Sequence, residues 1–212
     1  RHIGQWLIAA VVLLALGIPA WLDLNKTLGL QVLPHLEKLP TTVAMRSAFK
    51  TIDQLPDGST ALVIFDYDPT QAGEMNPIAD VLLRHLIARG VNVTTASLNP
   101  LGSSVAQAQW LKASGQLSDT VQFKNLGYVA GQSIGVQQLL ANHSAISLIV
   151  DVAASPDSLR VWAEQLAASN SNTPLIAGLS AGAEPLALPY IRSGQVKGTV
   201  VGMVGAFAYA QY

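Results

Sequence analysis

The hydrophobic pattern of this chain begins with one uninterrupted apolar run and then changes to short alternating segments. Residues 3–22 contain no charged side chain over 20 positions. As a helix with a rise of about 1.5 Å per residue, this run is about 30 Å long, which matches the hydrocarbon layer of a membrane. Trp6 and Trp21 lie near its two ends, where indole rings favour the headgroup region, and Asp23 ends the run. The pattern predicts one transmembrane helix, anchored in membrane lipid by Trp6 and Trp21.

Residues 23–58 form an apolar connector between this run and the rest of the chain. Three prolines and several leucines distinguish it from a flexible Gly/Ser linker. Val43, Phe49 and Ile52 fall near helical spacing, and two threonines that can cap a helix precede them. We therefore expect an amphipathic helix that lies on the following domain or on the membrane surface.

Residues 59–212 alternate short apolar runs with segments of helical periodicity. Turn and capping residues such as Asn76-Pro77, Ser133 and Ser155-Pro156 separate the runs from the helices. The predicted strands are residues 61–65, 91–98, 121–129, 145–152, 175–179 and 199–204. Strands that are apolar on both faces, each followed by a helix, are typical of a parallel sheet covered on both sides. The pattern predicts a Rossmann-like, doubly wound α/β domain with a mostly parallel sheet of about six strands.

Composition and charge narrow the classes of function. The formal net charge is -1, and the chain has no cysteine, so a strongly basic nucleic-acid surface and thiolate or cysteine-ligated metal chemistry are excluded. Only 12% of the residues are charged, about half the usual share of roughly 25%. This low charge favours burial of the surface against a membrane or a permanent protein partner.

Several polar side chains follow the predicted strands at the point where each strand ends. The carboxyl ends of parallel strands meet at one edge of the sheet, where open α/β proteins bind their ligands. These residues are therefore the ligand-binding candidates. They are Thr70, Ser97, Asn99, Ser155 and Ser180.

One short motif after the first strand suggests a specific chemistry. The residues from Val63 to Thr70 read VIFDYDPT, which resembles the first motif of the haloacid-dehalogenase-like phosphohydrolases. The resemblance implies that Asp66 is a nucleophile that forms an aspartyl-phosphate and that Asp68 is the acid/base. It also implies that Lys124 contacts phosphate. The Mg²⁺ ligands that it implies are Asp66, Asp68, Asp151 and Asp157.

Non-catalytic interpretations compete with this resemblance. An aspartate after a strand commonly caps a turn or helix, because its carboxylate accepts hydrogen bonds from free backbone N–H groups. Ser180 lies in a Gly-x-Ser-x-Gly sequence, but no histidine follows His143, so the triad order of a hydrolase is excluded. The segment from Gly127 to Gly135 is rich in glycine but lacks the lysine of a phosphate-binding loop. These observations favour a protein that is not an enzyme.

The sequence therefore leads to one principal hypothesis and two alternatives. We expect a membrane-anchored accessory or structural subunit of a membrane protein assembly, with a non-catalytic α/β binding domain and no cofactor. The alternatives are a Mg²⁺-dependent phosphohydrolase that uses Asp66 and Asp68, and a small-molecule-binding sensor. The expected partners are membrane lipid, through residues 3–22, and other membrane protein subunits. Because a large domain after an N-terminal anchor is commonly exported, we expect an extracytoplasmic location.

Overall fold

The computed structural model describes Trp6, Val11, Val12, Leu14, Leu39 and residues 41–115, 121–143, 145–169 and 171–212. The predicted transmembrane helix, with Trp21, lies outside these residues apart from Trp6, Val11, Val12 and Leu14, which are helical. Within the described part of the chain, no helix has both the length and the apolar character needed to cross a bilayer. One compact unit extends from Pro40 to Tyr212.

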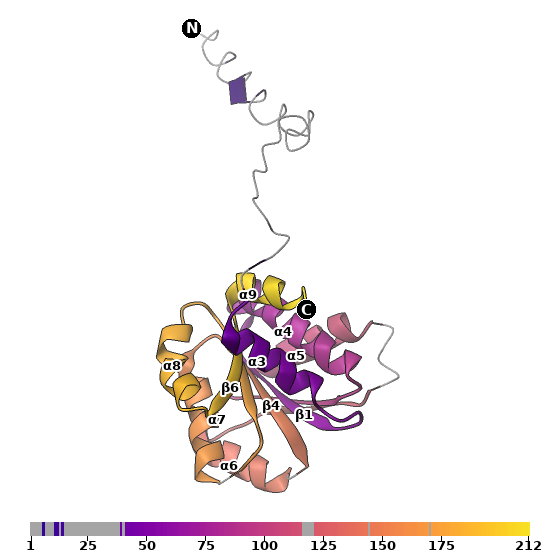
Figure 1. Ribbon diagram of the computed structural model, residues 1–212, viewed down its shortest axis with the longest axis vertical. Coiled ribbons are helices and arrows are strands. Elements are labelled where there is room, and N and C mark those ends of the chain that lie inside the picture. The colour runs from indigo at the N-terminus through magenta and orange to yellow at the C-terminus, as the bar shows by residue number, and fades with distance from the viewer. Residues whose placement is uncertain are drawn as a thin grey trace. The chain divides into compact units, whose positions relative to one another are not determined.

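This unit alternates strands with helices along almost its whole length (Figure 1). The elements, in chain order, are α3 (Val43–Asp53), β1 (Thr60–Asp66), the short 3-10 helix η2 (Pro69–Gln71), α4 (Ala72–Ala88), β2 (Asn92–Ser97), α5 (Gly102–Ser114), β3 (Phe123–Tyr128), α6 (Ser133–Asn142), β4 (Ile146–Ala153), α7 (Pro156–Ala168), β5 (Leu175–Leu179), α8 (Glu184–Arg192), β6 (Val196–Val201) and α9 (Gly202–Tyr209).

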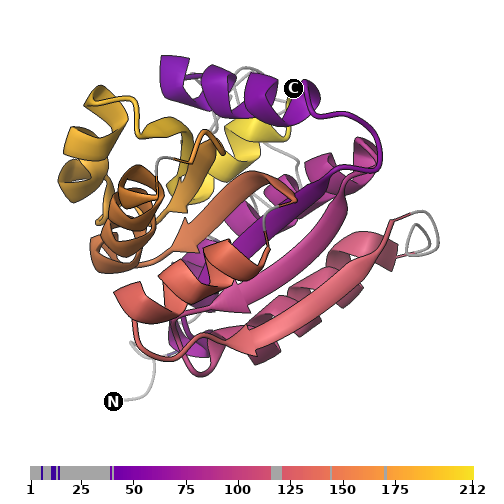
Figure 2. The same cartoon turned by 90° about the horizontal axis from the view of Figure 1, so that it is seen from below.

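The strands form a single parallel sheet in the order β3-β2-β1-β4-β5-β6. Helices α3, α4, α5 and α9 cover one face, and α6, α7 and α8 cover the other (Figure 2). The order reverses between β1 and β4, which is the position where doubly wound proteins open a crevice at the carboxyl edge. The predicted Rossmann-like α/β sheet of six parallel strands is confirmed.

Burial of strand side chains on both faces holds the layers together. On the side of α6 and α7, Leu62, Ile64 and Ile149 belong to one buried cluster with Trp162 of α7. Ser155 caps α7 by accepting a hydrogen bond from the N–H of Asp157, and a proline at the first helical position fixes the direction of the chain. The local sequence thus sets the start of α7 at the carboxyl edge of the sheet.

The compact unit begins earlier than the predicted domain of residues 59–212, because α3 packs against β6. Gly198 makes this contact possible, since a Cβ at this position would collide with the backbone of Ala44 and Ala48. Ala48 and Ile52 are fully buried, so the amphipathic helix of the connector packs on the domain core.

Two further boundaries differ from the sequence prediction. Helix α4 begins at Ala72, and Pro77 lies inside it, because Asp68 and Gln71 form a capping box that starts helical structure before the Asn76-Pro77 pair. Strand β6 ends at Val201, because Gly202 takes a positive φ of 62° and turns the chain into α9.

Candidate functional site

A crevice of about 290 Å³ opens at the carboxyl edge of the sheet, where the strand order reverses. Its walls come from the ends of β1 and β2 and from the starts of α6 and α7. The lining residues are Asp66, Leu98, Asn99, Pro100, Gln132, Ser155, Asp157 and Ser158. The crevice therefore presents carboxylate, amide and hydroxyl groups, and none of its lining side chains is basic.

Asp66, the last residue of β1, is held in one orientation at the crevice. Its Oδ1 accepts a hydrogen bond from the backbone N–H of Leu98 at 2.5 Å and a longer one from the hydroxyl of Ser97 at 3.3 Å. Its Oδ2 accepts a hydrogen bond from the indole Nε1 of Trp162 at 3.3 Å. These donors stabilise the ionised carboxylate, and they link β1 to β2 and to α7.

Burial acts on the pKa of Asp66 in the opposite direction to these hydrogen bonds. Asp66 is 7% exposed, and desolvation raises the pKa of its carboxyl group from 3.8 to about 6. Asp151 in β4 is fully buried, and neither of its carboxylate oxygens has a hydrogen-bond partner. Desolvation first, and then the charge of Asp66, raises the pKa of Asp151 well above its usual value. Protonation therefore offsets much of the cost of burying this acid.

Asp68 and Thr70 lie in the loop after β1 and form the start of η2. The Oδ1 of Asp68 accepts hydrogen bonds from the N–H of Thr70 at 2.7 Å and from its hydroxyl at 2.5 Å. These bonds lower the pKa of the exposed Asp68 carboxyl group. The Asp68 carboxylate thus caps η2, and neither Asp68 nor Thr70 is among the lining residues of the crevice.

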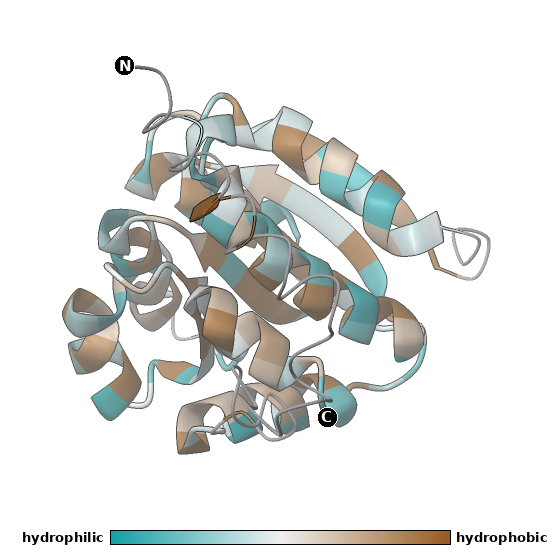
Figure 3. Cartoon of the chain, turned by 90° about the horizontal axis from the view of Figure 1, so that it is seen from above, coloured by the Kyte–Doolittle hydropathy of each residue, from teal (hydrophilic) through white to brown (hydrophobic). Residues whose placement is uncertain are grey.

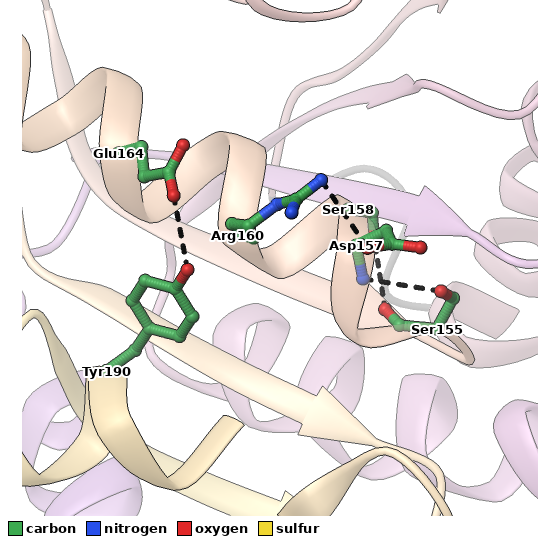
Figure 4. A network of polar contacts seen from close by, with 6 residues as sticks. All are labelled: Ser155, Asp157, Ser158, Arg160, Glu164 and Tyr190. Atoms are coloured by element: carbon green, nitrogen blue, oxygen red, sulfur yellow. Dashed lines mark hydrogen bonds and ion pairs between the residues drawn. The ribbon is translucent and has the colours of Figure 1, made fainter. Parts of the chain in front are cut away.

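Helix α7 contributes three polar residues to the crevice wall and continues into a surface network (Figure 4). Asp157 forms an ion pair of 3.5 Å with Arg160, in which both side chains are largely exposed. Further along the same helix, Glu164 accepts a hydrogen bond of 3.2 Å from the hydroxyl of Tyr190 in α8. Arg160 therefore partly compensates the charge of Asp157 on the outer side of α7.

The remaining candidate residues take different places. Asn99 lines the crevice, and its Oδ1 accepts a hydrogen bond from the N–H of Leu101. Ser97 lies beneath the crevice, where it contacts Asp66. Ser180 follows β5 and donates its hydroxyl proton to the carbonyl of Ala154. Lys124 is exposed in β3 opposite Thr94, two strands away from β1.

The structure thus brings Asp66, Asn99, Ser155 and Asp157 to one crevice, and it leaves Thr70, Lys124 and Ser180 outside its lining. Among the described residues, no group of three or more His, Cys, Asp or Glu side chains is placed to hold a metal ion. The donor set therefore does not fit the Mg²⁺ site that the phosphohydrolase resemblance implies.

Sequence reasoning missed Trp162 and four of the lining residues, which are Leu98, Pro100, Gln132 and Ser158. Trp162 lies at helical spacing from other apolar residues, which is typical of a core position. Nothing in the local sequence therefore indicates its hydrogen bond to Asp66. Gln132 lines the crevice with a positive φ of 51°, and it is the only described non-glycine residue with a positive φ. The glycine-rich sequence around it was the available signal, since such segments form tight turns.

The sheet order and the crevice at the reversal point define the class of the protein, which is a Rossmann-like doubly wound α/β protein. Comparison with protein families and with curated proteins finds no match for the chain. Among solved structures, it is similar to the E. coli tRNA N6-threonylcarbamoyladenosine dehydratase TcdA, with 11% sequence identity and a TM-score of 0.47. The similarity covers 77% of this chain and 85% of that chain.

Proposed function

We propose that this protein is a membrane-anchored accessory subunit of a membrane protein assembly, tethered by residues 3–22 and with its α/β domain on the extracytoplasmic side. The domain binds its protein partner through the carboxyl edge of the sheet and carries no catalysis of its own. The observation that supports this function best is a set of exposed apolar side chains along that edge.

This set, which we name the apolar rim, comes from helix starts and one strand end. It consists of Leu101, Tyr128, Ile134, Leu186, Met203 and Val204, which are 44% to 66% exposed. In a parallel sheet these positions all lie at the carboxyl edge. They come from both helical layers, and Figure 3 shows that α9, which supplies two of them, has almost no hydrophilic colour. Exposed apolar side chains that gather at one edge of a domain favour an interaction site there.

Charge is also distributed unevenly between the two edges of the sheet. Glu74, Asp157 and Glu184 lie in the first turns of α4, α7 and α8. Lys112 and Arg192 lie in the last turns of α5 and α8. Acidic side chains at helix starts and basic side chains at helix ends interact favourably with the helix dipoles. This distribution makes the carboxyl edge acidic as well as apolar. Such a surface complements a protein with apolar and basic side chains, whereas it repels anionic lipid headgroups.

The chain enters the domain close to the same edge. Met45, in the first turn of α3, packs next to Gly205 of α9, and α9 begins at the carboxyl edge. Val43, two residues earlier, is 74% exposed. Residues 23–42 span at most about 70 Å when fully extended, so a membrane anchor at residues 3–22 confines the rim to the neighbourhood of membrane proteins.

The crevice supports the sensor hypothesis as a second candidate function. A volume of about 290 Å³ at the reversal point accommodates one small ligand. The phosphohydrolase alternative requires Asp66, Lys124 and Asp151 to converge, and the position of Lys124 in β3 gives it less support. Mg²⁺-dependent phosphate release that Asp66→Asn abolishes would favour this alternative.

Extraction of the tagged full chain from its native membrane in a mild detergent tests the proposed function. We expect one membrane protein to co-purify in a stoichiometric amount. Ile134→Asp combined with Leu186→Asp should lower the recovery of this partner at least tenfold, because each adds a charge to the apolar rim.

Leu111→Asp is the matched control, because Leu111 has the same 65% exposure as Leu186 but lies in the last turn of α5, at the other edge of the sheet. This variant should retain the partner. The proposal is wrong if no stoichiometric partner appears, or if the control loses the partner as completely as the rim variant.

A further inference from the structure

Two acidic side chains lie one behind the other at the crevice: Asp66 lines it, and Asp151 is fully buried behind it. In the register of β1 with β4, Asp66 is opposite Ala153 and Ile64 is opposite Asp151. Ile64 and Ala153 belong to the same buried cluster, so Asp66 and Asp151 lie on the same face of the sheet, one alternate position apart. The two carboxyl groups also interact electrostatically.

No basic side chain compensates this pair in the described part of the chain. The neighbours that hydrogen-bond to Asp66 are the backbone N–H groups of Leu98 and Asn99, the hydroxyl of Ser97 and the indole of Trp162. Neither carboxylate oxygen of Asp151 has a hydrogen-bond partner. Helix α6 and strand β2, which face the crevice, contain no titratable side chain.

The only other acid in the crevice is Asp157 of α7, and Arg160 already pairs with it at the surface. An uncompensated negative charge in a low-dielectric site attracts a cation more strongly than an exposed carboxylate does. The same charge repels phosphate and carboxylate ligands. The charge at the floor of the crevice therefore selects a positively charged ligand.

We propose that this crevice binds a small organic ligand through an ammonium group, which the carboxylate of Asp66 receives, with the buried carboxyl group of Asp151 behind it. An ammonium group fits better than a metal ion, because the described residues supply no set of three metal-ligating side chains. The hydrogen bonds to Asp66 hold its carboxylate in place before the ligand arrives, which reduces the entropy lost on binding. Asn99 and Ser155, which line the same crevice, offer hydrogen bonds to the remainder of the ligand.

The site also predicts how binding depends on pH. Asp66 must be ionised to receive an ammonium group, and burial raises the pKa of its carboxyl group to about 6. Asp151 and Asp157 are the other titratable groups that lie beneath or along the crevice, and both are acids. Affinity for an amine should therefore increase between pH 5 and pH 7.

The indole N–H of Trp162 is a direct reporter of the site, because it donates to Asp66. We suggest a titration of the ¹⁵N-labelled full chain in detergent with butylammonium chloride, in which the indole N–H resonance of Trp162 is monitored by NMR. Trp162→Phe assigns that resonance among the four tryptophans of the chain. We expect a saturable shift with butylammonium and none with 1-butanol, its neutral isostere.

Variants then locate the binding site. Asp66→Asn should weaken butylammonium binding at least tenfold and remove its pH dependence, and Ser158→Phe should weaken it by filling the crevice. Asp53→Asn, which removes an exposed carboxylate from α3, should have no effect. Thermal unfolding of each variant identifies any loss of the fold.

Three results would overturn the proposal. These are an indole shift that 1-butanol reproduces, a butylammonium response that is unchanged in Asp66→Asn, and a response to MgCl₂ at lower concentrations than to butylammonium. Failure of this site leaves the partner-binding function of the apolar rim intact, because the rim variants do not line the crevice.

Discussion

The indole Nε1 of Trp162 lies 3.3 Å from Oδ2 of Asp66 and joins two residues that are 96 positions apart in the chain. Trp162 is fully buried in α7, and Asp66 ends β1. This bond fixes α7 against the strand on one side of the reversal point. It therefore couples the wall of the crevice to the charge at its floor.

Trp162→Phe removes this donor and keeps most of the aromatic volume. We expect a loss of about 1 kcal/mol in the free energy of unfolding, because one buried hydrogen bond is lost. The pKa of Asp66 should rise further above its value of about 6, because its carboxylate loses a donor. Urea denaturation and a carboxyl ¹³C NMR titration measure the two effects. Trp110→Phe is the control, because Trp110 stacks on Phe123 and does not contact Asp66, and an equal pKa change in this variant would contradict the prediction.

The stability of the domain should fall as pH rises through the range in which Asp66 titrates. Burial raises the pKa of Asp66 from 3.8 in a model peptide to about 6 in the folded protein. The folded state therefore holds a proton that the unfolded state releases, so the contribution is full below pH 4 and is lost as pH passes about 6. The shift corresponds to at most about 3 kcal/mol.

Urea denaturation of the full chain in detergent between pH 3.5 and pH 8 measures this dependence. Asp66→Asn should reduce the slope of the unfolding free energy between pH 4 and pH 6. A wild-type profile that rises over this interval would show that the donors to Asp66 outweigh its burial.

Local sequence predicted the sheet well, because buried parallel strands leave continuous apolar runs. The run before Asp151 corresponds to β4, and residues 175–179 are the whole of β5. It also placed Asp66 and Ser155 at the carboxyl edge, because Asp66 ends β1 and Ser155 lies two residues after β4. These features depend on residues that are adjacent in the chain.

The burial of the acids could not be predicted in the same way. Asp151 is fully buried because β4 is a central strand between β1 and β5, and local periodicity does not determine strand order. Asp66 is covered by Trp162 from a distant helix. Ile134 and Leu186 of the apolar rim occupy helical positions that the sequence cannot distinguish from core positions. Their exposure follows from how α6 and α8 rotate on the sheet.

Asp151→Val should stabilise the domain at pH 8. Both carboxylate oxygens of Asp151 are buried without a partner, so the substitution removes a polar group that contributes no hydrogen bond. Valine is also well suited to a strand. We expect a gain of about 1–3 kcal/mol in the free energy of unfolding at pH 8, and a smaller gain at pH 4, where the acid is protonated. Asp53→Ala, on the exposed surface of α3, should change stability by less than about 0.5 kcal/mol. Destabilisation by Asp151→Val at pH 8 would mean that the carboxylate makes a compensating contact.

Gly198→Ala should loosen the contact between α3 and β6. A Cβ at Gly198 would collide with the carbonyl of Ala44 and the N–H of Ala48, and these are backbone atoms that cannot move without displacing the helix. We expect a loss of about 1–3 kcal/mol in the free energy of unfolding and faster amide exchange in α3 than in β1. Gly182→Ala is the matched control, because nothing lies within 4 Å of its added Cβ and its φ is not positive. Because α3 joins the predicted membrane segment to the sheet, equal amide protection of α3 in both variants would show that the helix is held by contacts other than this close approach.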